Sequence, residues 1–336
     1  MSRLPGTEIL FFEPPAPGSD GKGRKVRPNI MVYQLPTPIA HAAQFRPIRL
    51  HNRKMMASFI KKTMLRHNFR QPLLWCTTPR DAQLVDRLPH RGLVYDCQRY
   101  WSNLPLEWEG SLAAAAEVCF VTSEGLADRL STCSSNIALL PNGNNFPMFS
   151  REFLDIPPEA VDLKPGRVLG YVGTLHADLD VTPLLMAAHT HPEWTFLLVG
   201  RVENSNYLHK LNRYKNIRIL GARPPVEIPD YLGCCDVCIN LLRRSHEDSD
   251  VIPSRIYEYL AAGKKVVSML WPRQMQEYPD VVRPARTPEV FVEQCAAALL
   301  EDPTSSLRRR RDYGDASAWD KRADEVIRIL EINGLY

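Results

Sequence analysis

Residues 250–267 read DVIPSRIYEYLAAGKKVV, and this stretch predicts a loop, a helix and a buried strand in succession. Pro253 suits the first turn of a helix, because the N–H of that position is unpaired and proline already has a helical φ. Gly263 is typical of a helix end, and the apolar run after it is typical of a strand. The amides that open the helix, backed by its dipole, predict an anion site at Val251, Ile252, Ser254 and Arg255.

Two carboxylates flank this predicted anion site. Asp250 precedes the helix and Glu258 lies in its second turn, so they can face groups on opposite sides of a bound phosphate. Carboxylates accept hydrogen bonds from sugar hydroxyls, and a nucleotide-sugar carries a hexose on one side of its diphosphate and a ribose on the other. A helix ion pair between Arg255 and Glu258, which are spaced i, i+3, is the alternative.

Outside this stretch, short β-branched or aromatic runs alternate with amphipathic segments. This predicts an α/β protein with two doubly wound, Rossmann-like halves joined near residue 160. Because such sheets bind ligands at the carboxyl ends of their strands, we expect the site in a cleft between the halves. The predicted strands cover 8–13, 29–34, 73–76, 92–96, 118–122, 137–140, 168–172, 195–199, 217–220, 237–241 and 265–269. The predicted helices cover 47–68, 79–88, 107–116, 181–189, 207–213, 227–234 and 253–262.

Residues that directly follow the predicted strands are further site candidates, because they reach that edge of the sheet. In the first half this rule selects Gln98, and in the second half it selects Gly173, Thr174, His176, Arg201 and Arg223. His176 and Arg201 are equally compatible with an ordinary surface position. Neither G-x-G-x-x-G nor G-x-x-x-x-G-K-[ST] occurs, so the phosphate motifs of nucleotide dehydrogenases and P-loop NTPases are absent.

Taken together, these motifs resemble the retaining GT-B glycosyltransferases of the family 4-like type, called "glycosyl transferases group 1". That family has an acidic residue, seven others and then a Glu that opens an EYLAAGKPVV run; here residues 258–267 read EYLAAGKKVV. The segments GYVGT at 170–174, FLLVG at 196–200 and LLPNG at 139–143 agree in order and spacing. The resemblance covers roughly residues 90–330.

The resemblance implies a hexosyltransferase-type enzyme that moves a sugar, with retention, from a UDP- or GDP-sugar to a glycan or polyprenol-linked acceptor in cell-surface polysaccharide synthesis. It implies that Asp250 contacts the donor sugar and Glu258 the ribose. The amides of Val251 and Ile252 would hold the diphosphate above Gly173 and Thr174, and main-chain groups near residues 221–223 would meet the base. Catalysis would be mostly leaving-group stabilisation and positioning, and neither a cofactor nor a metal ion is implied.

Three positions depart from the family pattern. Asp250 stands where Glu is usual, and Arg255 stands where many members have Lys. Gln98 follows the VYD segment, where an acidic residue or histidine commonly faces the anomeric centre. Because glutamine cannot act as a base, Gln98 favours a catalytically silent GT-B module that binds nucleotide or partner proteins. A GT-B sugar-nucleotide epimerase is a further alternative, for which the sequence offers no cleft acid or base.

The first 80 residues contain 14 Lys/Arg and three acidic residues, a net charge of +11, whereas the whole chain carries +4. Such a segment predicts an anionic partner. Residues 49–70 hold seven of these cations beside a stripe of Met56, Phe59, Ile60 and Met64, which fits either a core-packing helix or an anionic membrane surface. Nucleic acid is not expected, since no aromatic-studded motif accompanies the charge. We expect a cytoplasmic protein, peripheral on the inner face of the membrane.

The expected domains are residues 1–160 on the acceptor side, 161–316 on the donor side, and a helix over 317–336 that crosses back to the first. The strand over residues 8–13 resembles the second strand of a GT-B N-terminal half, so the first strand and helix of that half are expected to be missing. The eight cysteines include one C-x-x-C, Cys235 to Cys238, without a second pair, which favours buried free thiols over zinc. Asp248-Ser-Asp250 matches the metal-binding DxD motif, which we interpret as coincidence.

Overall fold

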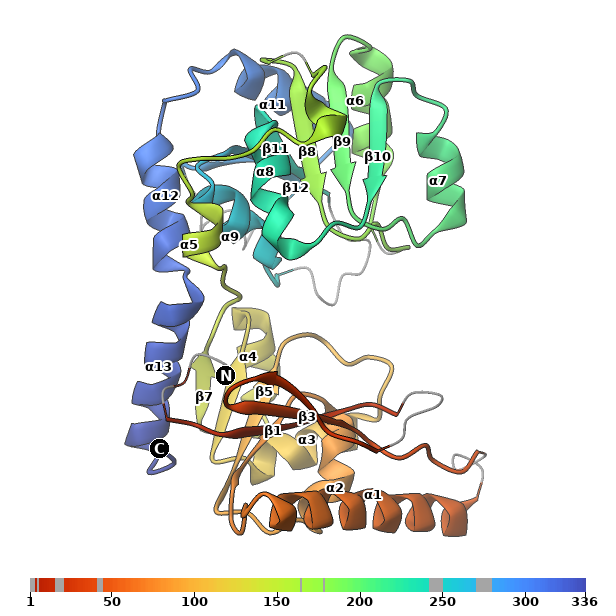
Figure 1. The fold of residues 1–336 in the computed structure, drawn as a ribbon, viewed down its shortest axis with the longest axis vertical. Coiled ribbons are helices and arrows are strands. Elements are labelled where there is room, and N and C mark those ends of the chain that lie inside the picture. Colours follow the sequence, from red (N-terminus) through yellow and green to blue (C-terminus); the bar gives the residue numbers. More distant parts are fainter. Residues whose placement is uncertain are drawn as a thin grey trace. The chain divides into compact units, whose positions relative to one another are not determined.

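The computed structural model describes residues 4, 6–15, 21–40, 45–163, 165–177, 179–241, 250–269 and 280–336. The chain forms two compact units, Met1–Leu140 with Ala323–Tyr336 and Pro141–Arg322 (Figure 1). The junction falls at residue 140, earlier than the sequence indicated, because the segment after it packs into the second unit. Phe149, for example, is buried in the same hydrophobic cluster as Tyr231.

The second unit is built on a six-stranded sheet in which every pairing is parallel. The strand order is β10-β9-β8-β11-β12-β13, which is the order of the doubly wound fold. Five of the strands were predicted from the sequence, whereas β13, whose run contains Arg283 and Pro284, was not. The strands are β8 (Val168–Val172), β9 (Thr195–Val199), β10 (Ile217–Gly221), β11 (Val237–Asn240), β12 (Lys265–Met269) and β13 (Val282–Ala285).

Helices bury both faces of this sheet, so alternate residues of one strand enter different cores. Leu169 packs with α6 (Thr182–Thr190) and α11 (Pro288–Leu300), whereas its neighbour Val168 packs with α8 (Ile228–Gly233) and α9 (Ser254–Ala261). Burial on both faces is the reason why the strands read as continuous apolar runs. The remaining helices in the described part of this unit are α5 (Phe146–Phe149), α7 (Ser205–Leu211) and α12 (Leu307–Ala316), with short 3-10 turns at Pro158–Ala160 and Pro225–Glu227.

The first unit contains a four-stranded parallel sheet in the order β4-β5-β6-β7. The last helix of the chain, α13 (Trp319–Ile332), supplies Val326 and Leu330 to its core, where they pack with Val94 and Phe120. The strands are β4 (Leu73–Cys76), β5 (Gly92–Cys97), β6 (Val118–Val121) and β7 (Ile137–Leu139). The helices around them are a 3-10 turn at Pro79–Asp81, α2 (Ala82–Val85), α3 (Leu106–Ala115) and α4 (Glu124–Leu130).

A separate three-stranded sheet opens the chain, so the first half contains two sheets rather than one continuous sheet. Here β1 (Ile9–Glu13) runs parallel to β3 (Ile30–Gln34), and the antiparallel β2 (Arg24–Arg27) pairs with the other edge of β3. The sequence did not predict β2, because its RKVR run has no apolar periodicity. Along the chain, β2 comes between β1 and β3, where a doubly wound half would have a helix.

The basic segment forms α1 (Arg46–Arg66), and its apolar stripe packs into the first unit. The Phe59 ring meets Phe12 and Tyr33 edge-on, at centroid distances of 6.5 and 6.4 Å, and Ile60 and Met64 are buried. This confirms core packing for the stripe. The basic face is a different surface, on which Arg49, Lys54, Lys61, Lys62 and Arg66 are exposed. No helix among the described residues is long and apolar enough to cross a membrane.

Candidate active site

The helix predicted from the opening stretch is α9, and the structure ties it to the end of β8. Its N-cap Pro253 is extended, with φ −70° and ψ 143°, and the helix ends before Gly263, whose φ is +71°. Ile256, Tyr257 and Leu260 are buried beneath the sheet. The Tyr259 hydroxyl accepts a 2.8 Å hydrogen bond from the backbone N–H of Val172, which fixes α9 against the last residue of that strand.

Arg255, in the first turn of α9, lies against the glycine turn that follows β8. Its guanidinium donates a hydrogen bond to the Tyr171 hydroxyl, and its Cζ lies 4.8 Å from the centroid of the Tyr171 ring. A Cβ built on Gly173 would lie 3.1 Å from the same guanidinium. The sequence alternative of an Arg255–Glu258 ion pair is not what the structure shows, since Arg255 points to Tyr171 and Gly173 instead. A cation thus lies at the strand end, where a phosphate is expected.

The turns after β8 and β9 pack backbone against backbone. Gly173 and Gly200 have φ values of +138° and +148°, which L side chains rarely adopt. The Gly173 N–H donates to Val199 O at 2.9 Å, and the Gly200 N–H donates to Gly221 O at 2.8 Å. The ends of three strands of the sheet are therefore joined by backbone hydrogen bonds, without side chains between the two glycines.

Glu258, in the second turn of α9, has an unusual electrostatic environment. Burial raises the pKa of its carboxyl to about 7, and the nearby Arg255 only partly offsets this effect. Among the described residues its carboxylate has no hydrogen-bond donor. A buried carboxylate without a donor costs free energy unless something binds it. Glu258 therefore combines a raised pKa with acceptor capacity that a ligand hydroxyl could satisfy.

The segment that enters α9 is held by the first turn of the second unit. The Asn142 side-chain amide donates to the carbonyl oxygen of Ile252 at 2.8 Å, and the Ile252 side chain is buried in the core. Asp250 and Val251, both half-buried, are therefore placed directly before the helix. The loop before them, with Asp248 of the DxD match, lies outside the described residues.

Three predicted donor residues lie at the same edge but differ in their contacts. The His176 Nδ1 lies 3.0 Å from Glu203 Oε2, and both side chains are exposed. Arg223 donates to Glu159 at 2.5 Å and lies over the Tyr231 ring, at 5.7 Å from its centroid. Arg201 is exposed. Arg223 therefore already has structural partners, and a direct ligand role for it or for His176 stays a prediction.

In the first unit, the end of β5 brings Gln98 together with a residue for which no sugar contact was predicted. The Asp96 carboxylate accepts from Gln98 Nε2 and from Trp75 Nε1, both at 3.1 Å on Oδ2. Burial raises the pKa of Asp96, and the two hydrogen bonds partly oppose this. The backbone carbonyl of Gln98 accepts from the Thr122 hydroxyl at 3.1 Å. Asp96 ends the predicted strand over residues 92–96, so the strand-end rule includes it as it includes Gln98, although only Gln98 was predicted to contact the sugar.

The described part of the chain contains no group of three or more His, Cys, Asp or Glu side chains that could hold a metal. All eight cysteines are free, and Cys235 and Cys238 are buried within the second unit. The burial expected for the two C-x-x-C thiols is confirmed. That the reaction requires no metal stays a prediction.

No family model matches the chain. TuaH of Bacillus subtilis (strain 168), a protein assigned as a teichuronic acid biosynthesis glycosyltransferase, is 25% identical over 288 residues, which cover 77% of this chain and 72% of TuaH. Sucrose-phosphate synthase of Thermosynechococcus elongatus superposes with a TM-score of 0.75 at 15% identity, over 97% of this chain and 89% of that one. Anabaena HepE, solved with UDP and glucose, gives a TM-score of 0.67 at 15% identity, over 90% and 86% of the two chains. The chain has the GT-B fold of these glycosyltransferases.

Proposed function

We propose that the chain is a retaining hexosyltransferase that moves a sugar from a UDP- or GDP-sugar to a glycan or polyprenol-linked acceptor during cell-surface polysaccharide synthesis. The observation that carries this proposal is the meeting of Gly173, Arg255 and Glu258 at the start of α9. These residues offer a close backbone approach, a cation and, among the described residues, a carboxylate without a hydrogen-bond donor. The TuaH relative supports the polysaccharide context, and the HepE complex with UDP and glucose supports the donor class.

In this proposal the donor binds along the start of α9. The amides of Val251 and Ile252 and the Arg255 guanidinium hold the diphosphate, with the turn of Gly173 and Thr174 beneath it. A helix N-terminus and a guanidinium both favour negative charge. Glu258 accepts hydrogen bonds from the ribose hydroxyls, and Asp250 accepts from the hydroxyls of the transferred sugar.

The proposed chemistry is departure of the nucleoside diphosphate. The bond between the anomeric carbon and the phosphate oxygen breaks, the acceptor hydroxyl oxygen bonds to that carbon on the same face, and its proton passes to the departing diphosphate, on which negative charge grows. Arg255 and the helix amides are already oriented before that charge appears, so they stabilise the transition state more than the ground state. Gln98, held by Asp96, would hydrogen-bond a sugar hydroxyl and orient it. No step of this scheme requires a metal ion.

For the site of action, we propose the cytoplasmic face of the membrane. The exposed cations of α1 would attract anionic lipid headgroups, with each Lys or Arg near the surface worth about 1 kcal/mol. This would bring the enzyme to a lipid-linked acceptor. No nucleic acid is included among the proposed partners.

The experiment that tests this proposal is a thermal-shift screen of the purified chain against UDP, GDP and their sugars, followed by hydrolysis and transfer assays. A ligand that binds the folded state raises the Tm in proportion to its saturation. Glu258→Ala should abolish most of the nucleotide-dependent shift without unfolding the protein. An unchanged shift in that variant would refute the assignment of Glu258 to the nucleotide.

Gln98 supports a second candidate function, a module that binds nucleotide or partner proteins without turnover. Its amide is already engaged by Asp96, and it cannot accept a proton as a base. A chain that binds nucleotide but transfers no sugar from any donor, with glycan or lipid acceptors present, would establish this candidate. Measurable transfer that Gln98→Ala lowers, with unchanged nucleotide affinity, would exclude it.

A further inference from the structure

Two adjoining hollows lie beside α1 and α2 in the first unit, away from every strand end considered above. Their volumes are about 440 and 410 Å3, and both are lined by Asp86 and Arg87, the two residues that follow α2. One hollow is lined mainly by polar side chains and the other by apolar ones. Because they share these two residues, we treat them as one groove with a polar part and an apolar part.

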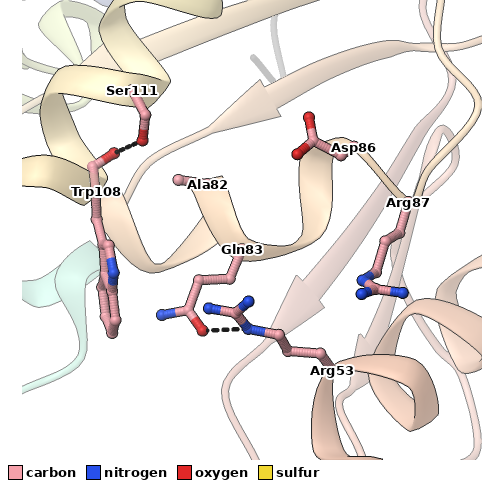
Figure 2. A pocket seen from close by; sticks show the side chains of 7 residues that line it. All are labelled: Arg53, Ala82, Gln83, Asp86, Arg87, Trp108 and Ser111. Carbon is pink, nitrogen blue, oxygen red and sulfur yellow. Dashed lines mark hydrogen bonds between the residues drawn. The ribbon is translucent and has the colours of Figure 1, made fainter. Parts of the chain in front are cut away.

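The polar part of the groove presents two guanidinium groups. Arg53 of α1 donates from Nε to Gln83 Oε1 at 2.7 Å. Among the described residues no hydrogen-bond acceptor meets its two terminal nitrogens, so these can contact a ligand. Figure 2 shows Arg53 and Arg87 on the same side of α2, with the indole of Trp108 beyond Gln83. The Asp86 carboxylate points away from both guanidinium groups in this view. Two cationic side chains therefore line this part of the groove.

The charges around Arg53 show that this part of the groove is electropositive. Burial lowers the pKa of Arg53, and repulsion from the positive charges of Arg49 and Arg87 lowers it further. A bound anion would relieve that repulsion, whereas a neutral sugar would not. Among the described residues no acidic side chain forms an ion pair with Arg53 or Arg87.

The apolar part of the groove continues from Arg87 along the C-terminal half of α1. Met64, Leu65 and Phe69 line it, opposite Leu88 and Pro89. Leu65 is 67% exposed, so a bound chain could cover it. Lys61 also lines this part, so its rim remains cationic. An apolar surface that starts beside two cationic side chains matches an amphiphile with an anionic head and an apolar chain.

We propose that this groove binds a single-chain lipid phosphate. Arg53 and Arg87 contact the phosphate, and the first isoprenoid units of the chain lie on Met64, Leu65 and Phe69. The proposal deepens the proposed function, on which it rests, because it locates the lipid part of a polyprenol-linked acceptor. An acidic glycan would fill the polar part and leave Leu65 and Phe69 uncovered. A two-chain bilayer lipid would keep its chains in the membrane and contact only the exposed cations of α1.

Binding of geranylgeranyl phosphate to the purified full chain, without any nucleotide-sugar, tests the proposal. The emission of Trp108 and the other tryptophans, or a thermal shift, reports saturation. We expect both inorganic phosphate, which lacks the chain, and geranylgeraniol, which lacks the phosphate, to bind at least about tenfold more weakly, since each half of the ligand carries part of the free energy. Glucuronic acid and phosphatidylglycerol vesicles represent the acidic glycan and the bilayer surface.

The variants distinguish the groove from general attraction to a basic helix. Arg53→Ala and Arg87→Ala should each weaken geranylgeranyl phosphate binding by about tenfold, the usual effect of losing one charge-assisted hydrogen bond. Leu65→Ser should weaken it through lost chain contact. Lys62→Ala, an exposed position of α1 outside the groove, should leave the affinity for dispersed geranylgeranyl phosphate unchanged, because the role proposed for Lys62 is attraction to a bilayer surface.

Several outcomes would overturn the proposal. These are equal weakening by Lys62→Ala and Arg53→Ala, binding of glucuronic acid as tight as that of the lipid phosphate, or unchanged affinity in both arginine variants. UDP binding at the donor site is measured separately, by thermal shift on the same samples. A variant that loses lipid phosphate but keeps the UDP shift is folded, so failure of the groove and failure of the proposed function are distinguishable.

Discussion

The α-carbon of Gly200 faces the carbonyl oxygen of Gly173 so closely that a Cβ at residue 200 would lie 2.1 Å from that oxygen. Both glycines have φ values in the region that L side chains avoid, and both turns end strands of the same sheet. The contact therefore sets the shape of the floor on which a diphosphate would bind. It also leads to the first prediction.

Gly200→Ala should destabilise the second unit and abolish nucleotide binding, because neither backbone can move without breaking the Gly173 N–H to Val199 O hydrogen bond. Gly166→Ala is the matched control, since Gly166 also has a positive φ but no atom near its Cβ position. We expect the control to cost about 1 kcal/mol from its φ alone. Gly200→Ala should cost about 1–3 kcal/mol more through overpacking, measured by urea unfolding. Equal costs would contradict the close contact.

Arg255 and Arg223 should respond differently to truncation, although both were predicted to contact the donor. Arg255→Ala removes the cation beside Gly173, and we expect about a tenfold loss of UDP affinity by calorimetry, typical of a charge-assisted contact. Arg223→Ala removes its contacts with Glu159 and Tyr231, so it should lower the Tm of the protein and change its UDP affinity little. If Arg223→Ala weakened UDP binding as strongly as Arg255→Ala, the distinction would be wrong.

Glu258→Gln should stabilise the unliganded protein above neutral pH while it weakens nucleotide binding. Burial raises the carboxyl pKa to about 7 in the folded chain, against 4.5 for an ordinary glutamate, so the folded state holds the proton more tightly. The free energy of unfolding contributed by Glu258 therefore falls as pH rises from about 4.5 to 7, and the loss is complete above the folded pKa. Wild type and Glu258→Gln should differ in stability at pH 8 and converge near pH 4.5.

The titration of Glu258 should also change the affinity for UDP. An ionised carboxylate is the stronger acceptor for ribose hydroxyls, so UDP affinity of the wild type should fall as pH drops from about 8 to 6. Glu258→Gln should bind weakly at both values, with little pH dependence of its own. A wild-type affinity that is constant across this range would show that the ionised Glu258 does not contact the nucleotide.

Asn144→Ala should lower the stability of the second unit without touching the donor site. Asn144 forms a parallel bridge with Ala318, and its buried side-chain amide donates to Gly314 O at 2.7 Å. Its backbone N–H donates to Ser317 O at 3.0 Å. Losing the amide leaves a buried acceptor unpaired, at a cost of about 1–3 kcal/mol by urea unfolding. Asn145→Ala, whose side chain is half-buried, is the comparison, and an equal or larger cost there would contradict the prediction.

Much of the fold could be predicted because burial on both faces leaves a local record in the sequence. The apolar runs at 168–172, 195–199 and 265–269 become β8, β9 and β12 with the predicted bounds. The edge strands β2 and β13 were not predicted, because their charged or proline-containing runs lack an apolar pattern. Of the candidate site, the sequence predicted the position of α9, because Pro253 precedes the helix and Gly263 follows its end.

The sequence by itself determined where most of the strands, helix α9 and the carboxylate Glu258 lie along the chain, because these follow from neighbours a few residues away. Only the tertiary structure decided what each candidate side chain contacts. It turned Arg255 onto Tyr171, paired Arg223 with Glu159, joined Gln98 to Asp96, and raised the pKa of Glu258 by burial. The first two contacts join residues that are distant in the sequence. The burial of Glu258 depends on how the whole unit packs around it, so no local sequence pattern predicts its raised pKa.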